Sequence, residues 1–316
     1  MREKKNFAQR TNALENAEIK RKYFLVYEGE ETEQIYFDAI DENKVKLRIS
    51  PLIELVPIVR SYSEQGWSNP QKILDRVLLN LKEEKSSKVS YETLLNWIME
   101  YLLDTLNLSC RNIVVKKYWS ILEGVCKENL NAQLIDITPD VDSSCQEILK
   151  KFIEKAKIEC NLDNAAEIIR KHAISYEDGF DKICFIIDRD RNSFVSHPDN
   201  DQYGYVLKQC REYGFGFYLT NPCFEFWLLL HFNEVMNMDE EKLLENKKGA
   251  GKRSFTENEL RKLMPGYKKS KYNVDILLSK IDMAIKNEKK FCEDEEKLEC
   301  TLGSRVGLLI EEMRNQ

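Results

Sequence analysis

The stretch KICFIIDRDRNSF, Lys182 to Phe194, joins a strongly apolar segment directly to two aspartates. The run from Ile183 to Ile187 predicts a strand buried on both faces, because such strands read as continuous apolar segments. Asp188 and Asp190 follow at once, and strand side chains two positions apart lie on the same face, roughly 7 Å apart. Carboxylates that close repel each other unless a cation lies between them or one of them is protonated. The pair alone leaves two interpretations open, a cation site and a solvent-facing strand end.

The 316-residue chain has the composition of a water-soluble globular protein. Hydrophobic residues make up 42% and charged residues 32%, and no run approaches the roughly 18 apolar residues of a membrane span. The basic N-terminal segment lacks the apolar stretch of a secretory signal, so we expect a cytoplasmic protein with no membrane contact. None of the nine cysteines forms a C-x-x-C pair, which predicts reduced thiols rather than disulfides or a zinc site.

Charge is distributed unevenly along the chain. The formal net charge is −6, yet the segment from Lys247 to Lys271 holds nine Lys/Arg and two Glu. A basic island on an acidic protein favours a localised anionic partner such as nucleic acid, with a solvated helix–loop surface as the alternative. The cations that we expect to bind nucleic acid are Lys247, Lys248, Lys252, Arg253, Lys268 and Lys271.

Strands alternate with helices in two parts of the chain, which predicts an α/β fold with a mostly parallel sheet flanked by helices. Pro57 indicates that the second strand lies at an edge or has a bulge. Thr32 is a candidate helix cap, and Asn69-Pro70 is a helix start signal. The predicted strands cover residues 23–27, 52–59, 183–187 and 215–220, with a helix over 202–212 after the third.

A segment of about ninety residues, 84–175, has the helical period instead and reads as a helical insertion. Ser144-x-x-Glu147 is a candidate capping box for its last helix. The predicted organisation is a polar lead (1–21), a first core part (22–83), the insertion (84–175), a second core part (176–235) and a basic loop with C-terminal helices (236–316).

Three carboxylates are expected at one edge of the sheet. Glu28 follows the first strand and is followed by Gly29, while Asp188 and Asp190 end the third strand. In open α/β sheets ligands bind outside the carboxyl ends of the parallel strands. Carboxylate oxygens suit hard cations, so the sequence predicts a Mg²⁺ or Mn²⁺ site at this edge.

Five motifs follow one another along the chain: YEGEETEQIYF (27–37), FIIDRD (185–190), TNPCFEFWLLLHF (220–232), YKKSKY (267–272) and TLGSRVGLLIEEM (301–313). In this order they resemble the RloB-like proteins of bacterial defence islands, over roughly residues 20–83 and 178–312. The resemblance implies a Toprim domain, the metal-binding α/β fold shared by topoisomerases, primases and OLD-type nucleases. It assigns Glu28 as general acid/base and Asp188 and Asp190 as metal ligands. The helical insertion departs from the family pattern and leaves substrate choice open.

Four further residues are candidates with equally plain structural alternatives. Glu225 lies in the apolar segment NPCFEFWLLL, where an unpaired charge would be costly, and we take it as a catalytic carboxylate. Glu33, Asn221 and His231 are candidates for the surroundings of the site. The structural alternatives are that Glu33 is a solvated glutamate in the first turn of a helix, that Asn221 forms a turn, and that His231 is a core histidine.

The sequence therefore favours a metal-dependent nuclease acting as an anti-phage, abortive-infection effector. RNA, including tRNA, is slightly preferred over DNA by analogy with related Toprim effectors. The chain has no ATPase motif, so gating by ATP would require an ATPase partner, and a homo-oligomer is compatible with the sequence. The alternative is a non-catalytic binding or regulatory module of a defence complex, which needs no metal.

Overall fold

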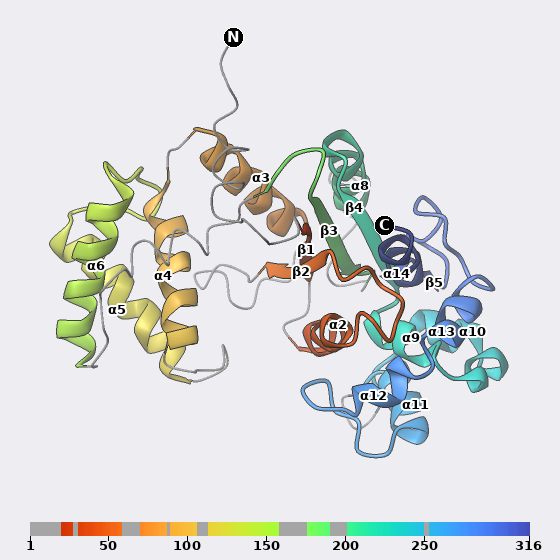
Figure 1. Ribbon diagram of the computed structural model, residues 1–316. Coiled ribbons are helices and arrows are strands. Elements are labelled where there is room, and N and C mark those ends of the chain that lie inside the picture. Colours follow the sequence, from red (N-terminus) through yellow and green to blue (C-terminus); the bar gives the residue numbers. More distant parts are fainter. Residues whose placement is uncertain are drawn as a thin grey trace, which may run out of the picture. The chain divides into compact units, whose positions relative to one another are not determined.

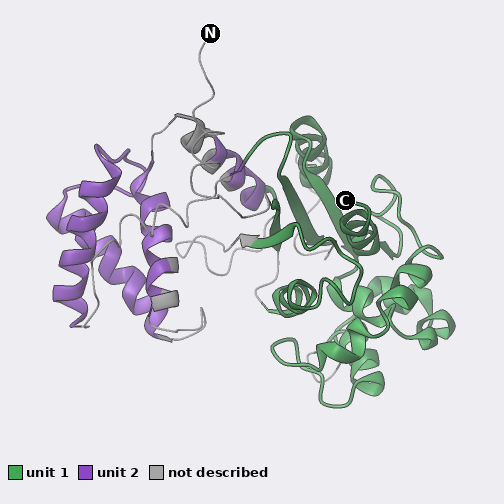
Figure 2. Cartoon of the chain, in the orientation of Figure 1, with its two compact units in different colours: residues 1–58, 68–71, 177–316 green, residues 59–67, 72–176 purple. Residues whose placement is uncertain are grey.

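The computed structural model describes residues 20–27, 31–58, 70–86, 89–105, 113–157, 176–189, 201–249 and 253–316. The chain divides into two compact units, coloured separately in Figure 2. Unit 1 consists of residues 1–58, 68–71 and 177–316, and unit 2 of residues 59–67 and 72–176. All strands of the described sheet belong to unit 1.

Unit 1 is built on a five-stranded sheet, whose strands are labelled in Figure 1. The strand order is β2 (Ile53–Ile58), β1 (Arg21–Tyr27), β3 (Lys182–Asp188), β4 (Gly216–Asn221) and β5 (Gly303–Ser304). The first four strands are parallel, and β5 pairs antiparallel with β4. The predicted α/β class with a mostly parallel sheet is confirmed, and it is consistent with a Toprim-like fold. β2 is an edge strand, as Pro57 predicted.

Helices cover both faces of the sheet. On one face, Tyr23, Leu25 and Tyr27 of β1 share a core with α2 (Thr32–Glu42), α9 (Phe224–Leu229), α13 (Ile281–Glu288) and α14 (Val306–Arg314). On the other face lies α8 (Gln202–Tyr213), whose Tyr203 ring meets Phe217 of β4 edge-on at 5.8 Å. This sandwich buries the sheet and leaves its strand ends as the places where polar side chains gather.

The chain between α9 and α13 consists of short helices that close over the same core. Each α-helix contributes buried leucines to this core: Leu243, Leu260, Leu277 and Leu278. The segments are η2 (Asn233–Asn237), α10 (Glu240–Glu245), α11 (Phe255–Leu263) and α12 (Val274–Leu278). Among the helices of the described ranges, none combines the length and apolar character needed to cross a membrane.

Unit 2 is helical. Its helices α4 (Tyr91–Thr105), α5 (Ile113–Asn129) and α6 (Val141–Ala156) share an apolar core, and α3 (Pro70–Ser86) starts at the predicted proline. The predicted capping box at Ser144 is wrong. Asp140 caps α6 instead, and its side chain accepts a hydrogen bond from the Ser143 N–H at 2.8 Å. The extended backbone at Asp140 places a carboxylate before the free amides, whereas Ser144 is buried within the first turns.

Candidate functional site

The carboxyl ends of β1, β3 and β4 lie next to one another at one edge of the sheet. Tyr27, the last residue of β1, pairs with Ile186 of β3, and Asp188 pairs with Thr220 of β4. In open α/β sheets ligands bind in the crevice outside the carboxyl ends of the parallel strands. The fold therefore brings Asp188 to the edge where the sequence placed the site.

Asp188 is joined to the helix that follows the neighbouring strand. Its Oδ1 accepts a hydrogen bond from the backbone N–H of Phe224, the first residue of α9, at 2.8 Å. The first amides of a helix lack partners within the helix, so a carboxylate stabilises that end. Asp188 therefore fixes the start of α9 relative to β3. The next residue, Arg189, is buried and pairs with Glu299 at 3.4 Å.

Glu225 is a buried carboxylate one residue further along α9. Its side chain is 2% exposed, and its Oε1 lies 2.7 Å from the Nζ of Lys269. The hydroxyl of Tyr267 donates a second, longer hydrogen bond to the same oxygen at 3.5 Å. A buried carboxylate is tolerated only when a cation or hydrogen-bond donors compensate its lost hydration. The sequence indicated an unusual charge in this apolar segment, and the structure supplies its partner.

Lys269 is the site residue that the sequence analysis missed. Burial lowers the pKa of its ammonium group, but the charges of Glu225 and Asp188, among others, outweigh burial and raise the pKa. Its side chain is 53% exposed, so the ammonium group contacts both the buried carboxylate and solvent. Nothing in the spacing of YKKSKY distinguishes Lys269 from its neighbouring lysines, because the distinguishing contact is 44 positions away in the sequence.

The start of α2 is tied to the same segment. The Tyr272 hydroxyl donates to the Thr32 carbonyl at 2.7 Å, and the Thr32 hydroxyl donates to the Lys269 carbonyl at 3.4 Å. Thr32 is not the helix cap that the sequence predicted, since Glu31 occupies that position without a side-chain cap bond. Glu33 is buried. The pKa of Tyr272 is raised mainly by burial of its hydroxyl, then by Tyr36, and also by the negative charge of Glu33. α2 thus places Glu33 on the side of the site.

The two other candidates make structural contacts. The buried Asn221 amide donates to the Leu298 carbonyl at 2.7 Å. The ring of His231 is fully buried, with Nδ1 3.1 Å from the Trp227 carbonyl and Nε2 2.9 Å from the Tyr36 hydroxyl. Burial lowers the pKa of His231 to about 3, so Nδ1 carries the proton and Nε2 accepts from Tyr36. The structure places this histidine in the core beneath the sheet rather than among the carboxylates.

Some predicted site residues lie outside the described residues: Glu28, Asp190 and Lys252. Within the described ranges, no three His, Cys, Asp or Glu side chains are grouped closely enough to hold a metal ion. Asp188 is the one predicted metal ligand within those ranges, so the metal site stays a prediction.

The basic island separates into paired and unpaired cations. Lys247 pairs with Glu245 at 2.8 Å, and Arg253 with Glu257 at 3.3 Å. In the part of the chain that the structure describes, no carboxylate pairs with Lys248, Lys268 or Lys271. The last two flank Lys269, so unpaired positive charge adjoins the Glu225 carboxylate.

Comparison with known proteins supports the resemblance seen in the motifs. The family model described as RloB-like protein matches residues 116–313, more than half of the chain. The match includes most of α5 and all of α6, which we expected to depart from the family pattern, and the sheet from β3 onward. It does not include β1, β2 or the first of the five motifs, residues 27–37. Searches of curated proteins and of solved structures found no significant match. The chain therefore belongs to the RloB-like protein family.

Proposed function

We propose that this protein is a Toprim-type, metal-dependent nuclease that serves as an anti-phage effector. The observation that carries the proposal is the joint position of Asp188 and the Glu225–Lys269 pair at the carboxyl edge of a parallel sheet. Lys268 and Lys271, which pair with no carboxylate within the described ranges, flank Lys269 in the sequence, which suits a polyanionic substrate. Membership of the RloB-like family is compatible with a defence-associated role.

The side chains described at this edge suit Mg²⁺ or Mn²⁺. The carboxylates of Asp188, Glu225 and Glu33 are of the donor type that hard divalent cations prefer, but within the described ranges they do not form a grouped ligand set by themselves. The nearby Cys223 thiol is buried, and burial raises its pKa well above the usual range, so it stays protonated and is a poor ligand. Asp188, with Asp190 and Glu28, would hold the ion. When bound, the ion would lower the pKa of an attacking water and stabilise charge on the phosphate.

The chain's own groups divide the remaining work. Glu28 would take and return the proton as general acid/base, as the family resemblance implies. Lys269 is half exposed beside Glu225, and its ammonium group would contact the scissile phosphate. The hydrogen bonds from Tyr272 and Thr32 keep the backbone of this segment against α2, so Lys269 is held in place before substrate arrives.

One observation favours the alternative, a non-catalytic binding module. Glu225 is already neutralised by Lys269, and such a pair needs no metal. The two functions differ in their need for a divalent ion, since a binding module would show neither specific Mg²⁺ or Mn²⁺ binding nor hydrolysis.

Purified protein incubated with total RNA, tRNA and plasmid DNA distinguishes them. We expect cleavage products with Mg²⁺ or Mn²⁺ and none with EDTA, with RNA cut in preference to DNA. Calorimetric titration of the same protein with each ion should show saturable binding. Intact nucleic acid under all conditions, together with no heat of metal binding, would leave the binding module as the function.

A further inference from the structure

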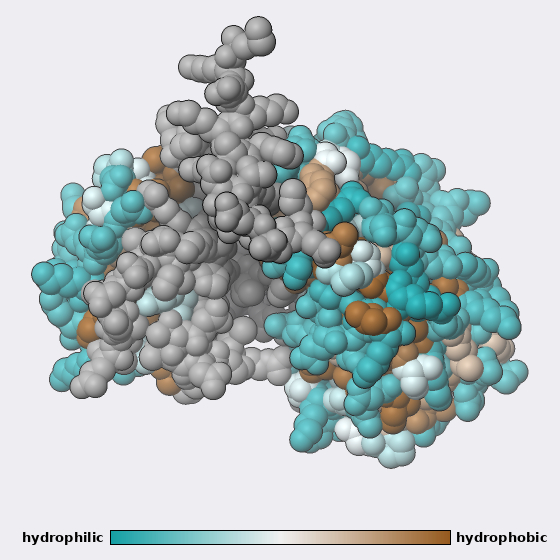
Figure 3. Space-filling view, viewed as in Figure 1, coloured by the Kyte–Doolittle hydropathy of each residue, from teal (hydrophilic) through white to brown (hydrophobic). Residues whose placement is uncertain are grey.

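An open pocket of about 510 Å³ lies on unit 1, where α11 leads into α12. Its walls include residues on both sides of the turn between Tyr267 and Tyr272, and Ile276 in the first turn of α12. The lining combines aromatic, aliphatic, cationic and amide side chains, notably Tyr267, Tyr272, Ile276, Lys268, Lys271 and Asn273. In Figure 3, hydrophobic atoms reach the surface among hydrophilic ones in the region where Figure 1 shows α11 and α12.

The apolar part of the pocket suits a flat ring. Tyr267 and Tyr272 contact each other with ring centroids 5.5 Å apart. The Tyr272 hydroxyl is engaged by the Thr32 carbonyl, so the ring is what this residue offers to the pocket. Ile276, also in the wall, keeps 39% of its surface exposed. A partly exposed aromatic ring beside an aliphatic side chain is the kind of surface on which nucleobases stack.

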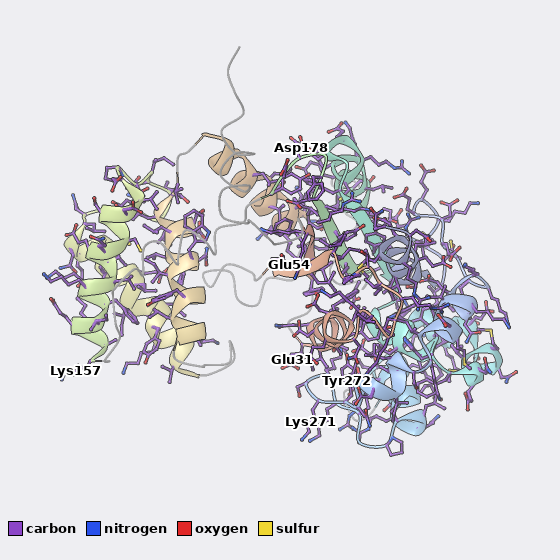
Figure 4. The ribbon with its side chains drawn as sticks, in the orientation of Figure 1. Glu31, Glu54, Lys157, Asp178, Lys271 and Tyr272 are labelled. Atoms are coloured by element: carbon purple, nitrogen blue, oxygen red, sulfur yellow. The ribbon has the colours of Figure 1, made fainter. Side chains whose placement is uncertain are left out.

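The cationic part suits a phosphate. Lys268 and Lys271 are both exposed, and neither pairs with a carboxylate within the described ranges. Their backbones are held together by two hydrogen bonds, of 3.1 and 2.9 Å, so both side chains leave a fixed turn. Figure 4 labels Lys271 and Tyr272 close to Glu31, in agreement with the bond from Tyr272 to the start of α2.

The pocket adjoins the carboxylate edge through one segment. Between Lys268 and Lys271 lies Lys269, whose ammonium group contacts Glu225, and the Tyr267 hydroxyl reaches the same carboxylate. A ligand in the pocket would therefore lie next to the segment that carries Lys269, whose ammonium group contacts Glu225 at the proposed site.

We infer that this pocket holds one nucleotide of a single-stranded nucleic acid, with its base against Tyr272 and its phosphate on Lys268 and Lys271. Bases in a duplex are stacked on one another and unavailable to a tyrosine, so the pocket selects unpaired strands, loops or ends. The inference rests on the proposed function insofar as it takes nucleic acid as the substrate, and it adds which form of nucleic acid is bound.

Binding measured in EDTA tests this inference apart from catalysis. Fluorescence anisotropy would compare a short labelled single-stranded RNA, the DNA of the same sequence and the RNA duplex. We expect either single strand to bind at least tenfold more tightly than the duplex, on the scale of the stacking of one base on an aromatic side chain. Unlabelled AMP, added as competitor, distinguishes a strand from a free nucleotide and should compete only weakly.

Variants locate the binding to the pocket. Tyr272→Leu should weaken single-strand binding about tenfold, whereas Tyr272→Phe, which keeps the ring, should bind like the wild type. Lys268→Gln with Lys271→Gln should reduce the salt slope by about 1.4, since each phosphate contact contributes about 0.7. The matched control is Lys242→Gln with Lys297→Gln, two exposed lysines outside the pocket whose acidic partners lie at 3.1 and 3.5 Å. It should change neither the affinity for single strands nor the salt slope.

Cross-linking provides a readout that does not depend on affinity. A 4-thiouridine-labelled strand, irradiated on the wild-type protein, should attach within residues 263–276. The inference would be overturned by equal binding of duplex and single strand, by tight competition by AMP, by unchanged binding of both Tyr272→Leu and the double lysine variant, or by cross-links confined to other segments. Binding that follows these expectations without any cleavage would refute the nuclease proposal and leave the pocket standing, and cleavage without such binding would do the reverse.

Discussion

The two units bury different kinds of side chain. The core shared by α4, α5 and α6 of unit 2 is apolar, and polar side chains such as Ser90 and Thr93, whose hydroxyls are 3.1 Å apart, lie beside it together with Glu92, which keeps 8% of its surface exposed. Unit 1 buries ionisable groups more deeply, among them Glu225, His231 and Glu288, which are at most 1% exposed.

This difference shows where burial of polar groups lowers the stability of each unit. A buried hydroxyl with a neighbour costs little, whereas a buried carboxylate or imidazole needs a specific partner or loses its charge. Such groups cluster at functional sites more often than in purely structural cores. Unit 1 contains buried ionisable groups in both settings: Glu225 lies at the strand edge of the proposed site, and His231 lies deep in the structural core.

The largest expected effect is on catalysis in unit 1. Asp188→Asn removes one negative charge without changing shape, and we expect cleavage to fall at least about 10²-fold, the lower end of what a catalytic carboxylate contributes. Gel-based rates with Mg²⁺ measure this. The matched control is Asp178→Asn, an exposed aspartate that precedes β3 at its amino end and is labelled in Figure 4. Wild-type cleavage by the Asp188 variant would remove this residue from the site.

The next effect tests the apolar core of unit 2. Phe152 is fully buried in α6 and meets Tyr118 edge-on at 5.2 Å. Phe152→Ala should destabilise unit 2 by about 3–5 kcal/mol, through lost transfer free energy and the cavity left behind. Denaturant titration measures this. Ile135→Ala, at a position 76% exposed in the same unit, should change almost nothing. Equal effects of both substitutions would mean that the three-helix core is not what holds unit 2 together.

A third prediction uses two buried groups of unit 1 whose pH effects oppose each other. Burial lowers the pKa of His231 from 6.5 to about 3 and raises that of Glu288 from 4.5 to about 7. The unfolded chain thus binds the proton of His231 below pH 6.5, so stability falls as the pH falls towards 3. The unfolded chain releases the proton of Glu288 above pH 4.5, so stability falls as the pH rises towards 7.

These two contributions nearly cancel between pH 4.5 and 6.5 in the wild type. Each single variant should expose the other slope, by about 2 kcal/mol across that window. Glu288→Gln should lose stability as the pH falls, and His231→Gln should gain it. Urea titrations at several pH values measure the slopes. Variants that slope in the same direction would contradict the assignment of these groups.

The smallest effect compares two ion pairs of nearly equal length. Lys269 and Glu225 of unit 1 lie 2.7 Å apart, and Lys155 and Glu128 of unit 2 lie 2.8 Å apart. Lys269→Met leaves a buried carboxylate unpaired and should cost about 1 kcal/mol, less than for a fully buried pair because solvent reaches the lysine. Lys155→Met should have no measurable effect, since both partners are exposed. Equal thermal shifts for the two variants would show that burial of Glu225 does not matter.

Much of unit 1 was predictable because its signals are local. A short, β-branched apolar run ending in Asp188 favours a buried strand, and Pro57 indicates an edge position or a bulge for β2. β5 was not predictable, because its two residues, Gly303 and Ser304, are too few to form a pattern. The cap positions also failed at Thr32 and Ser144, where the backbone rather than the residue type decides which side chain meets the free amides.

By itself the sequence determined the class of fold, the parallel strands and the presence of Asp188 at a strand end, because periodicity and apolar runs reflect burial along short segments. Only the tertiary structure decided that Lys269 neutralises Glu225 and that His231 lies in the core. The physical reason is that electrostatic interactions depend on distance and burial, and residues far apart in the chain acquire both only when the sheet and its helices assemble.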